Sequence, residues 1–245
     1  MPRWLAFSSV ALNLGFALAA TWAFFHASTL RVWRNRLQGV PPSPTASYYR
    51  QQRLAFFQAQ TPPPGSWVFA GDSQIALTDW YDLLSGRVPA VNRGISMERI
   101  DELTGRLPEI ARLHPATLVL MTGVNDLSAG ATPVEFASRY ERLLDRAQAL
   151  APDARIIVNG LLPVNAALNK QLTIPAASVP EANRLLAQIA TRRALSFVDL
   201  HSRFADERSN LRPDLTFDGL HLSTEGYLLW SSCLAPFLPP SQHQP

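Results

Sequence analysis

The sequence predicts a parallel α/β fold, and three observations lead to that class. Short apolar runs alternate with longer segments of helical pattern, as in repeated strand–helix–strand units. Capping motifs mark several helix starts, and polar residues follow several of the apolar runs. Such chains form a parallel sheet with helices on both faces. We expect five strands, near Trp67 to Ala70, Val88 to Val91, Thr117 to Thr122, Arg155 to Gly160 and Ser196 to Leu200.

Composition is that of a globular chain and excludes several kinds of site. Of the 245 residues, 47% are hydrophobic and 17% are charged. The net charge of +3 comes almost wholly from scattered arginines, since Lys170 is the only lysine, so no nucleic-acid surface is predicted. Cys233 is the only cysteine, which rules out an internal disulfide and a cysteine-based zinc site. Neither metal-ligand spacing nor a Gly-rich phosphate loop is present, so we expect no metal and no cofactor.

The amino-terminal segment predicts a membrane anchor over residues 1–30. No charged residue lies between Trp4 and Phe25, and a helix of that length spans the roughly 30 Å hydrocarbon core of a bilayer. A cleaved signal peptide with Ala17-Leu18-Ala19 as its small-residue site is an alternative, and a buried core helix is another. We expect a single transmembrane helix.

The orientation of this anchor rests on two opposing signals. Arg31, Arg34 and Arg36 outnumber Arg3 and the terminal amine by a narrow margin, which favours a cytoplasmic catalytic side. A head of only a few residues before the span is instead typical of an export signal-anchor. We expect the folded domain to lie outside the cytoplasm.

Between the anchor and the first strand, residues 31–65 predict a linker and a packing helix. Val40 to Pro44 is proline-rich and predicts a stiff, extended spacer. Tyr48 to Gln60 has a helical pattern, and Thr61 to Gly65 ends it. The folded domain then covers residues 66–238, and residues 239–245 form a tail.

Three later helices have recognisable starts. Thr132 to Glu135 is a capping box with proline at the first helical position, and its helix runs to about Leu150. Ser178 with Glu181 predicts a second cap of this kind. Ser223 opens the last helix, which ends near Leu234.

Ser73 is the candidate nucleophile. Gly71 ends the first strand abruptly, and a helix can begin over Ile75 to Trp80, so Ser73 lies at a strand-to-helix junction. Ligand sites of α/β folds occupy that edge of the sheet. The alternative is that Asp72 and Ser73 only cap the helix.

Polar groups after later strands converge on the same edge. They are Asn92-Arg93-Gly94, Gly123 to Asp126, and Asp218 to His221 before the last helix. A serine hydroxyl needs an imidazole to take its proton and an acid to orient that imidazole, and Asp218 and His221 can supply both. The N–H groups of Ser73 and Gly94 and the Asn125 amide can stabilise an oxyanion.

Other polar residues have structural interpretations. His114 predicts a solvated loop histidine, and His201 is expected to be structural although it could touch the edge of the site. Asp126 could be the acid, but the spacing of Asp218 to His221 favours Asp218. Asp72 is interpreted as a residue of the helix start.

These segments resemble the blocks of the SGNH (GDSL-like) hydrolase family. Gly71-Asp72-Ser73-Gln74, Gly94, Gly123 to Asp126 and Asp218 to His221 stand in the family's order. Asn-Arg-Gly-Ile-Ser looks closest to the branch similar to platelet-activating-factor acetylhydrolase and lysophospholipase-like esterases. The resemblance implies a three-layer α/β/α flavodoxin-like fold, a Ser73, Asp218, His221 triad, and an oxyanion hole from Ser73, Gly94 and Asn125. Gln74 departs from the family name, which has Leu, and leaves the substrate open.

The predicted function is that of a membrane-anchored serine esterase. It would cleave small or medium acyl esters, including O-acetyl, lipid or carbohydrate esters, through an acyl-enzyme. One alternative is a carbohydrate O-acyltransferase with the same triad, in which a sugar hydroxyl outcompetes water. Another is a catalytically idle module of the same fold that binds a glycan or a partner at the membrane.

Overall fold

The computed structural model describes residues 44–240, which divide between two compact units, residues 1–52 and 53–245. Of the first unit, the described part is the start of helix α3 (Pro44–Ala59). The second unit holds the rest of α3 and all elements below. The predicted anchor, residues 1–30, lies outside the described residues. Within residues 44–240, we find no helix with the length and apolar character needed to cross a bilayer.

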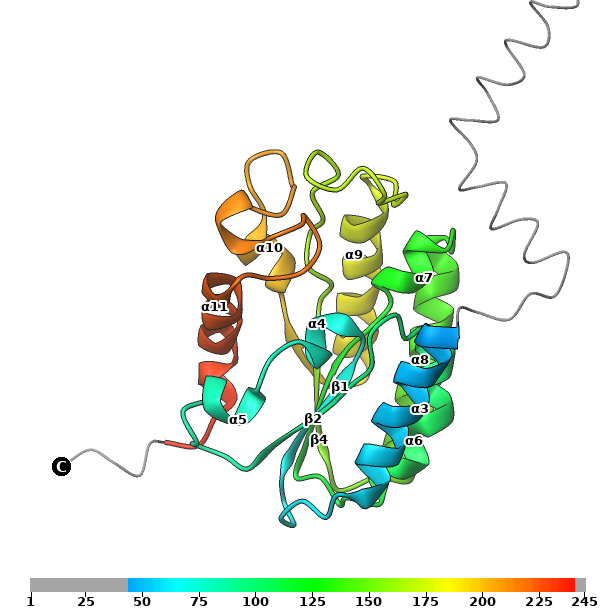
Figure 1. The fold of residues 1–245 in the computed structure, drawn as a ribbon, viewed down its shortest axis with the longest axis vertical. Coiled ribbons are helices and arrows are strands. Elements are labelled where there is room, and N and C mark those ends of the chain that lie inside the picture. Colours follow the sequence, from blue (N-terminus) through cyan, green and yellow to red (C-terminus); the bar gives the residue numbers. More distant parts are fainter. Residues whose placement is uncertain (1–43, 241–245) are drawn as a thin grey trace, which may run out of the picture. The chain divides into compact units, whose positions relative to one another are not determined.

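A five-stranded parallel sheet forms the centre of the second unit, as predicted. The strand order is β2-β1-β3-β4-β5, so β1 is internal and β2 lies at an edge (Figure 1). Gly71, the last residue of β1, is in register with Gly94 on one side and with Met121 on the other. The strands are β1 (Trp67–Gly71), β2 (Ala90–Gly94), β3 (Thr117–Met121), β4 (Arg155–Asn159) and β5 (Ser196–Val198).

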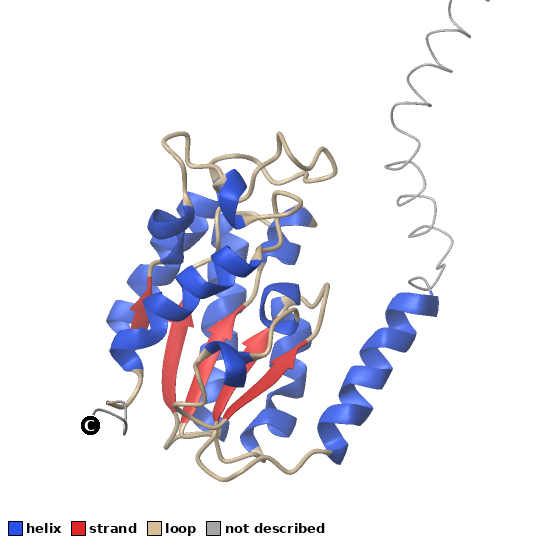
Figure 2. Cartoon of the chain, turned by 60° about the vertical axis from the view of Figure 1, so that its left-hand side comes forward, coloured by secondary structure: helices blue, strands red, loops and turns tan. Residues whose placement is uncertain are grey.

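Helices cover both faces of this sheet, which gives the predicted three layers (Figure 2). On one face α6 packs on α8, and α8 packs on α9. On the other face α5 and α10 contact α11. Right-handed crossovers between parallel strands produce this division. The bounds are α5 (Trp80–Leu83), α6 (Ile100–Ala111), α8 (Pro133–Leu150), α9 (Ser178–Arg192), α10 (Leu200–Phe204) and α11 (Thr224–Leu234).

Aromatic side chains join the sheet to α5 and α11. Trp80 stacks on Phe69 of β1 with ring centroids 4.1 Å apart, and it meets Trp230 edge to face at 5.0 Å. Tyr227 stacks on Trp230 at 6.2 Å. Pairs of this kind contribute about 0.5–1.5 kcal/mol beyond area burial. They fix the helices that flank the candidate site on this face.

Helix starts agree with the sequence at two positions and differ at a third. Thr132 caps α8 through Glu135 N–H, and Glu135 reaches back to Thr132 N–H, as predicted. Ser223 caps α11, also as predicted. The predicted cap at Ser178 is wrong: Ala177 occupies the cap position without a side-chain bond, and Glu181 is bound to Arg184.

Strand β2 begins two residues later than predicted and includes the polar residues expected to follow it. Asn92 stays in the strand because its Nδ2 donates to the carbonyls of Ile75 and Thr78, each at 2.8 Å. Arg93 is buried because Glu109 and Gln60 accept from its guanidinium. Long-range partners therefore keep polar side chains inside this strand.

Candidate active site

The turn from β1 into a short helix, α4 (Ser73–Ala76), presents Ser73. A side chain at Gly71 would meet the Met121 carbonyl oxygen at 1.7 Å, so only glycine allows β1 to approach β3 there. Asp72 then caps α4, because its Oδ1 accepts from Gln74 N–H at 3.0 Å. The prediction for Asp72 is confirmed, and the hydroxyl of Ser73 stands at the carboxyl edge of the sheet. The predicted helix over Ile75 to Trp80 is divided between α4 and α5.

Ser73, His221 and Asp218 form a continuous hydrogen-bonded chain. His221 Nε2 lies 3.0 Å from Ser73 Oγ, and His221 Nδ1 lies 2.8 Å from Asp218 Oδ2. Asp218 Oδ1 also accepts from the N–H groups of Leu220 and His221, at 2.9 and 2.7 Å. With Nδ1–H directed to Asp218, the lone pair of Nε2 faces the serine hydroxyl.

The pKa of Asp218 reflects these bonds. Partial burial raises it, but the bonds from the side chain and the N–H of His221, with that from Leu220, outweigh burial and hold the pKa below its ordinary value. Asp218 is therefore an anion at neutral pH, the form that accepts the imidazole N–H.

Gln74 links the serine turn to the loop that carries Asp218 and His221. Its side chain is 2% exposed, and its Nε2 donates to the Leu220 carbonyl at 2.5 Å. The backbone carbonyl of Gln74 accepts from Tyr227 Oη at 2.9 Å. From the sequence alone, Gln74 is only a departure from the family name, and its contact with Leu220 was not predicted. The one available signal was an amide beside the candidate nucleophile.

The three predicted oxyanion donors differ in whether they already donate a hydrogen bond within the protein. Ser73 N–H is the first of α4 and has no partner within that helix. Gly94 N–H donates to Asn92 Oδ1 at 2.8 Å. Asn125, on helix α7 (Val124–Ser128), donates from Nδ2 to the Glu98 carbonyl at 3.0 Å. Two of the donors are thus bonded to the protein.

A buried ion pair between Arg106 and Glu98 supports the segment from Gly94 to Glu98, whose carbonyl accepts from Asn125. Arg106 Nε lies 2.8 Å from Glu98 Oε1, and Arg106 Nη2 lies 2.6 Å from Glu98 Oε2. Arg106 Nη2 also donates to the Arg93 carbonyl at 2.5 Å. A bidentate guanidinium pair is directional as well as strong. It fixes the position of the Glu98 carbonyl, to which the Asn125 amide is bound.

Asp72 is completely buried behind the serine. Its Oδ2 has no hydrogen-bond partner among the residues that the structure describes. Burial raises its pKa to about 7, and the charges of Glu98 and Asp126 act in the same direction. Tyr140 lies close enough for Asp72 to raise its pKa further above the value that burial already elevates. Asp72 is thus a titratable group directly behind the site.

The other candidate residues lie outside the hydrogen-bonded chain. Asp126 accepts from Ile100 N–H and from Arg139, so it is a structural acid, as preferred from the sequence. His114 is exposed in a turn after α6. His201 is half-buried on α10, where burial lowers its pKa. Within residues 44–240, we find no cluster of three metal-ligating side chains.

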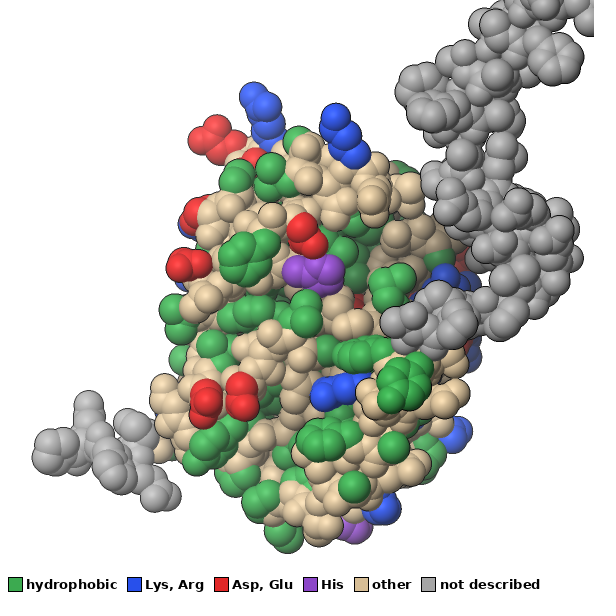
Figure 3. Space-filling model, in the orientation of Figure 1, with side chains coloured by type: hydrophobic (Ala, Val, Ile, Leu, Met, Phe, Trp, Pro, Cys, Tyr) green, Lys and Arg blue, Asp and Glu red, His purple; other side chains and the backbone are tan. Residues whose placement is uncertain are grey.

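Exposed apolar side chains lie near the chain of hydrogen bonds. Phe217, which precedes Asp218, is 80% exposed. Leu168 belongs to the connection after β4, where Asn165 N–H donates to the Gly219 carbonyl at 2.8 Å. Figure 3 shows this face of the molecule, with a histidine and an acidic side chain near its centre and hydrophobic side chains around them.

Known proteins share this fold and this sequence pattern. A model of the GDSL-like Lipase/Acylhydrolase family matches residues 65–229. Platelet-activating factor acetylhydrolase IB subunit alpha2 of Homo sapiens is 28% identical over 175 residues, which cover 65% of this chain and 70% of that protein. Subunit alpha1 of Rattus norvegicus is 28% identical over 172 residues, or 65% of this chain and 69% of that one.

Solved structures agree on the fold. A GDSL-like lipase from Bacteroides thetaiotaomicron superposes with a TM-score of 0.64 at 19% identity, covering 78% of this chain and 96% of that one. A lipase/acylhydrolase from Enterococcus faecalis gives 0.60 at 20% identity, covering 73% and 99%. The predicted family resemblance is confirmed. Because the family model spans well over half of its length, the chain belongs to the GDSL-like lipase/acylhydrolase family and is an ester hydrolase.

Proposed function

We propose that the chain is a serine esterase that cleaves small or medium acyl esters through an acyl-enzyme at Ser73. The observation that carries this proposal is the unbroken chain from Ser73 Oγ through His221 to Asp218, with bonds of 3.0 and 2.8 Å. Such a chain activates a hydroxyl that is otherwise a weak nucleophile at neutral pH.

In the first half of the reaction, Ser73 Oγ attacks the ester carbonyl carbon while His221 Nε2 takes the hydroxyl proton. Asp218 holds the imidazole in the productive tautomer and stabilises the imidazolium. The tetrahedral intermediate then collapses, the bond to the alcohol oxygen breaks, and His221 gives its proton to that oxygen. In the second half, a water molecule attacks the acyl carbon while His221 Nε2 takes its proton. The bond from the acyl group to Ser73 Oγ then breaks, His221 returns the proton to Oγ, and the acid is released.

The oxyanion of the intermediate would be stabilised by Ser73 N–H and by the Asn125 amide. Ser73 N–H is available because it is the first N–H of a helix, where the helix dipole also favours negative charge. Asn125 Nδ2 carries a second hydrogen besides the one given to Glu98. Gly94 N–H would have to exchange Asn92 Oδ1 for the substrate oxygen.

The substrate class is proposed from the exposed apolar side chains beside the triad. Phe217 and Leu168 are 80% and 50% exposed next to the Asp218–His221 loop, and both suit contact with an acyl chain. The similar proteins of Rattus norvegicus and Homo sapiens are named as acetylhydrolase subunits. We therefore place short acyl groups, acetyl first, ahead of long ones.

Ser73→Ala tests this function on the full chain with p-nitrophenyl acetate, butyrate and octanoate. The substitution should lower kcat/KM at least ~10⁴-fold on every ester, because it removes the attacking oxygen. Activity retained within tenfold of the parent would reject Ser73 as the nucleophile. A fluorophosphonate probe should label the parent and not the variant; failure to label the parent would favour the idle binding module.

Product analysis with an added polysaccharide separates hydrolysis from transfer. Free acid as the main product supports the esterase. Acylated polysaccharide as the main product would favour the acyltransferase that shares the same acyl-enzyme.

We also propose that residues 1–30 anchor the protein in a membrane with the folded domain outside the cytoplasm. The support is the uncharged stretch from Trp4 to Phe25. Fractionation followed by protease treatment of intact cells tests it. Recovery in the membrane fraction with cleavage from outside is the expected result, and a protected domain would reverse the orientation.

A further inference from the structure

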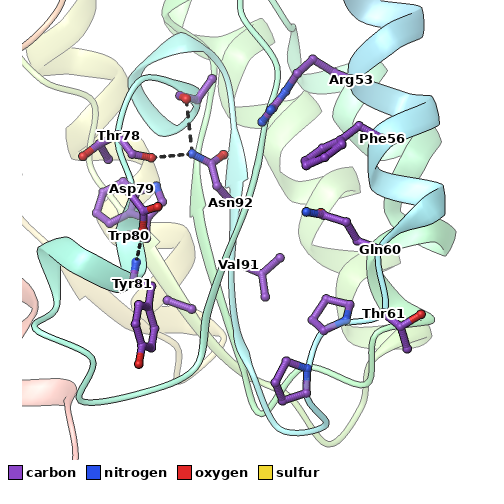
Figure 4. A pocket seen from close by; sticks show the side chains of 14 residues that line it. Arg53, Phe56, Gln60, Thr61, Thr78, Asp79, Trp80, Tyr81, Val91 and Asn92 are labelled. Carbon is purple, nitrogen blue, oxygen red and sulfur yellow. Dashed lines mark hydrogen bonds between the residues drawn. The ribbon is translucent and has the colours of Figure 1, made fainter.

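A groove of about 600 Å³ runs along strand β2, away from the serine. Figure 4 shows its two walls, with Arg53 and Phe56 on one side and Asp79 and Tyr81 on the other. Residues 90–92 of the strand lie between the walls. The size is in the range of peptide and small-molecule sites. The proposed esterase mechanism uses none of the side chains of these two walls.

One edge of β2 faces this groove. In the described part of the chain, β2 is paired only with β1. Pro89 and Ile95 both form backbone bonds to β1, through Pro89 O and Ile95 N. Since such bonds alternate along a strand, odd-numbered residues of β2 face β1, and the even-numbered Ala90 and Asn92 face away. This edge is a template for an additional strand.

Open and closed positions on this edge can be distinguished. At Gly94 the edge is closed, because its N–H donates to Asn92 Oδ1 and its carbonyl accepts from Arg53 Nη2 at 3.2 Å. The Asn92 carbonyl accepts from Arg93 Nη1 at 3.3 Å. Among residues 44–240, no hydrogen bond is made by the N–H or carbonyl of Ala90 or by the N–H of Asn92. These three groups are a donor, an acceptor and a donor in chain order, and the main chain of an extended peptide can pair with them.

An unpaired positive charge lies at the Gly94 end of the groove. Arg53 Nε is buried without a hydrogen bond, and the guanidinium lies 4.6 Å from the centroid of the Phe57 ring. The two other guanidiniums around this ring, those of Arg93 and Arg106, are each paired with a glutamate. The ion pairs of the described residues do not include Arg53. A carboxylate from a bound molecule would give Arg53 the ion pair that Arg93 and Arg106 already have.

We propose that the groove binds an extended peptide segment that adds to the edge of β2 and places a carboxylate on Arg53. The exposed rings of Phe56 and Tyr81, 54% and 50% accessible, would flank the peptide. A strand alongside Ala90 to Gly94 needs about five residues at ~3.3 Å per residue. A terminal carboxylate and an acidic side chain provide the same chemistry.

Fluorescence polarisation on the full chain tests the proposal with a labelled peptide of alternating threonine and valine that ends in a free carboxylate. We expect saturable binding, a loss of about tenfold when the terminus is amidated, and partial recovery when a glutamate replaces the penultimate residue of the amide. Arg53→Gln should lower the affinity for the acid to that of the amide. Arg142→Gln, a change in an exposed arginine on α8, should leave affinity unchanged.

Hydrogen exchange by NMR gives a second readout that does not depend on Arg53 variants folding well. Added peptide should slow exchange at Ala90 and Asn92 and leave Val91, already bonded to β1, unchanged. Uniform changes, equal affinity for acid and amide, or no binding up to millimolar peptide would overturn the proposal. Preferential binding of an oligosaccharide would do so as well. Ser73→Ala should bind peptide as the parent does, so failure here is independent of the esterase assay.

Discussion

The two sides of Ser73 differ in how their groups are bonded before any substrate arrives. On the acid–base side, His221 and Asp218 already form the bonds that proton transfer requires. On the oxyanion side, the donors of Gly94 and Asn125 are bonded to protein acceptors. The acid–base side is local, because Asp218 and His221 stand three positions apart in one turn, whereas the oxyanion side joins two strand ends through a buried ion pair. Proton transfer is therefore preset, whereas on the oxyanion side the Gly94 N–H has to give up an internal bond before it can bind the substrate oxygen.

Asp218→Asn should break the acid–base side and give the largest effect. An amide in this position can donate to His221 Nδ1, which favours the tautomer that has no lone pair facing Ser73. We expect kcat to fall ~10³–10⁴-fold with KM little changed, measured on p-nitrophenyl acetate. Asp214→Asn is the matched control, since Asp214 is bound to Arg212 and not to His221. Equal losses in both variants would contradict the assignment.

Asn125→Ala should break the oxyanion side with a smaller loss. Removing one oxyanion donor costs ~10²–10³ in kcat. The pH dependence of kcat/KM should keep its shape, because His221 and Asp218 are unchanged, whereas Asp218→Asn should alter it. An unfolding midpoint near that of the parent would show that the loss of the bond to Glu98 is tolerated. A changed pH profile would mean that Asn125 acts through the acid–base side.

Gln74→Leu should sharpen the comparison, because Gln74 belongs to the serine turn but positions the histidine loop. Leucine fills a similar volume with an apolar side chain, so the substitution removes the donor to the Leu220 carbonyl. We expect about a tenfold lower kcat with KM unchanged, since a small misplacement of the imidazole affects proton transfer more than substrate binding. Gln74→Met, which also lacks a donor, should behave alike. A kcat within twofold of the parent in both variants would exclude a positioning role.

The hydrogen bonds of the acid–base side were largely predictable from sequence, and those of the oxyanion side were not. Asp218 and His221 are three residues apart, so their proximity follows from chain geometry. Ser73 follows from a strand-ending glycine. The bond of Gly94 to Asn92 and the pairing of Glu98 with Arg106 depend on how β2 and α6 are packed, which no local pattern encodes.

The fold shows the same division. Apolar runs predicted all five strands, with most boundaries within two residues, because buried strands must be apolar. The predicted boundaries of strand β2 were too early in the chain, because Asn92 and Arg93 look like loop residues until their distant partners are known. Likewise Ser178 resembles a cap in sequence, but Glu181 is bound to Arg184 instead.

Asp72→Asn gives the smallest effect and tests the group that lies between the two sides. Asp72 Oδ1 holds Gln74 N–H, and Glu98 and Asp126 help burial to raise its pKa to about 7 from 3.8. The folded protein then keeps this proton over a pH range in which the unfolded chain has lost it. Asp72 therefore lowers the free energy of unfolding progressively as pH rises from about 4 to about 7, and the whole penalty persists above that.

Asparagine retains the capping oxygen and removes the titration. Urea unfolding should therefore show the variant more stable than the parent at pH 8, by at most about 4 kcal/mol from a shift of roughly three pKa units, and equal to it near pH 4. Tyr140, whose pKa Asp72 raises, supplies the control: Tyr140→Phe should change stability by the same amount at both pH values. A gain in Asp72→Asn that is independent of pH would show that folding does not raise the pKa of Asp72. In that case the buried carboxylate, like the donors of the oxyanion side, would be stabilised by bonds made within the protein.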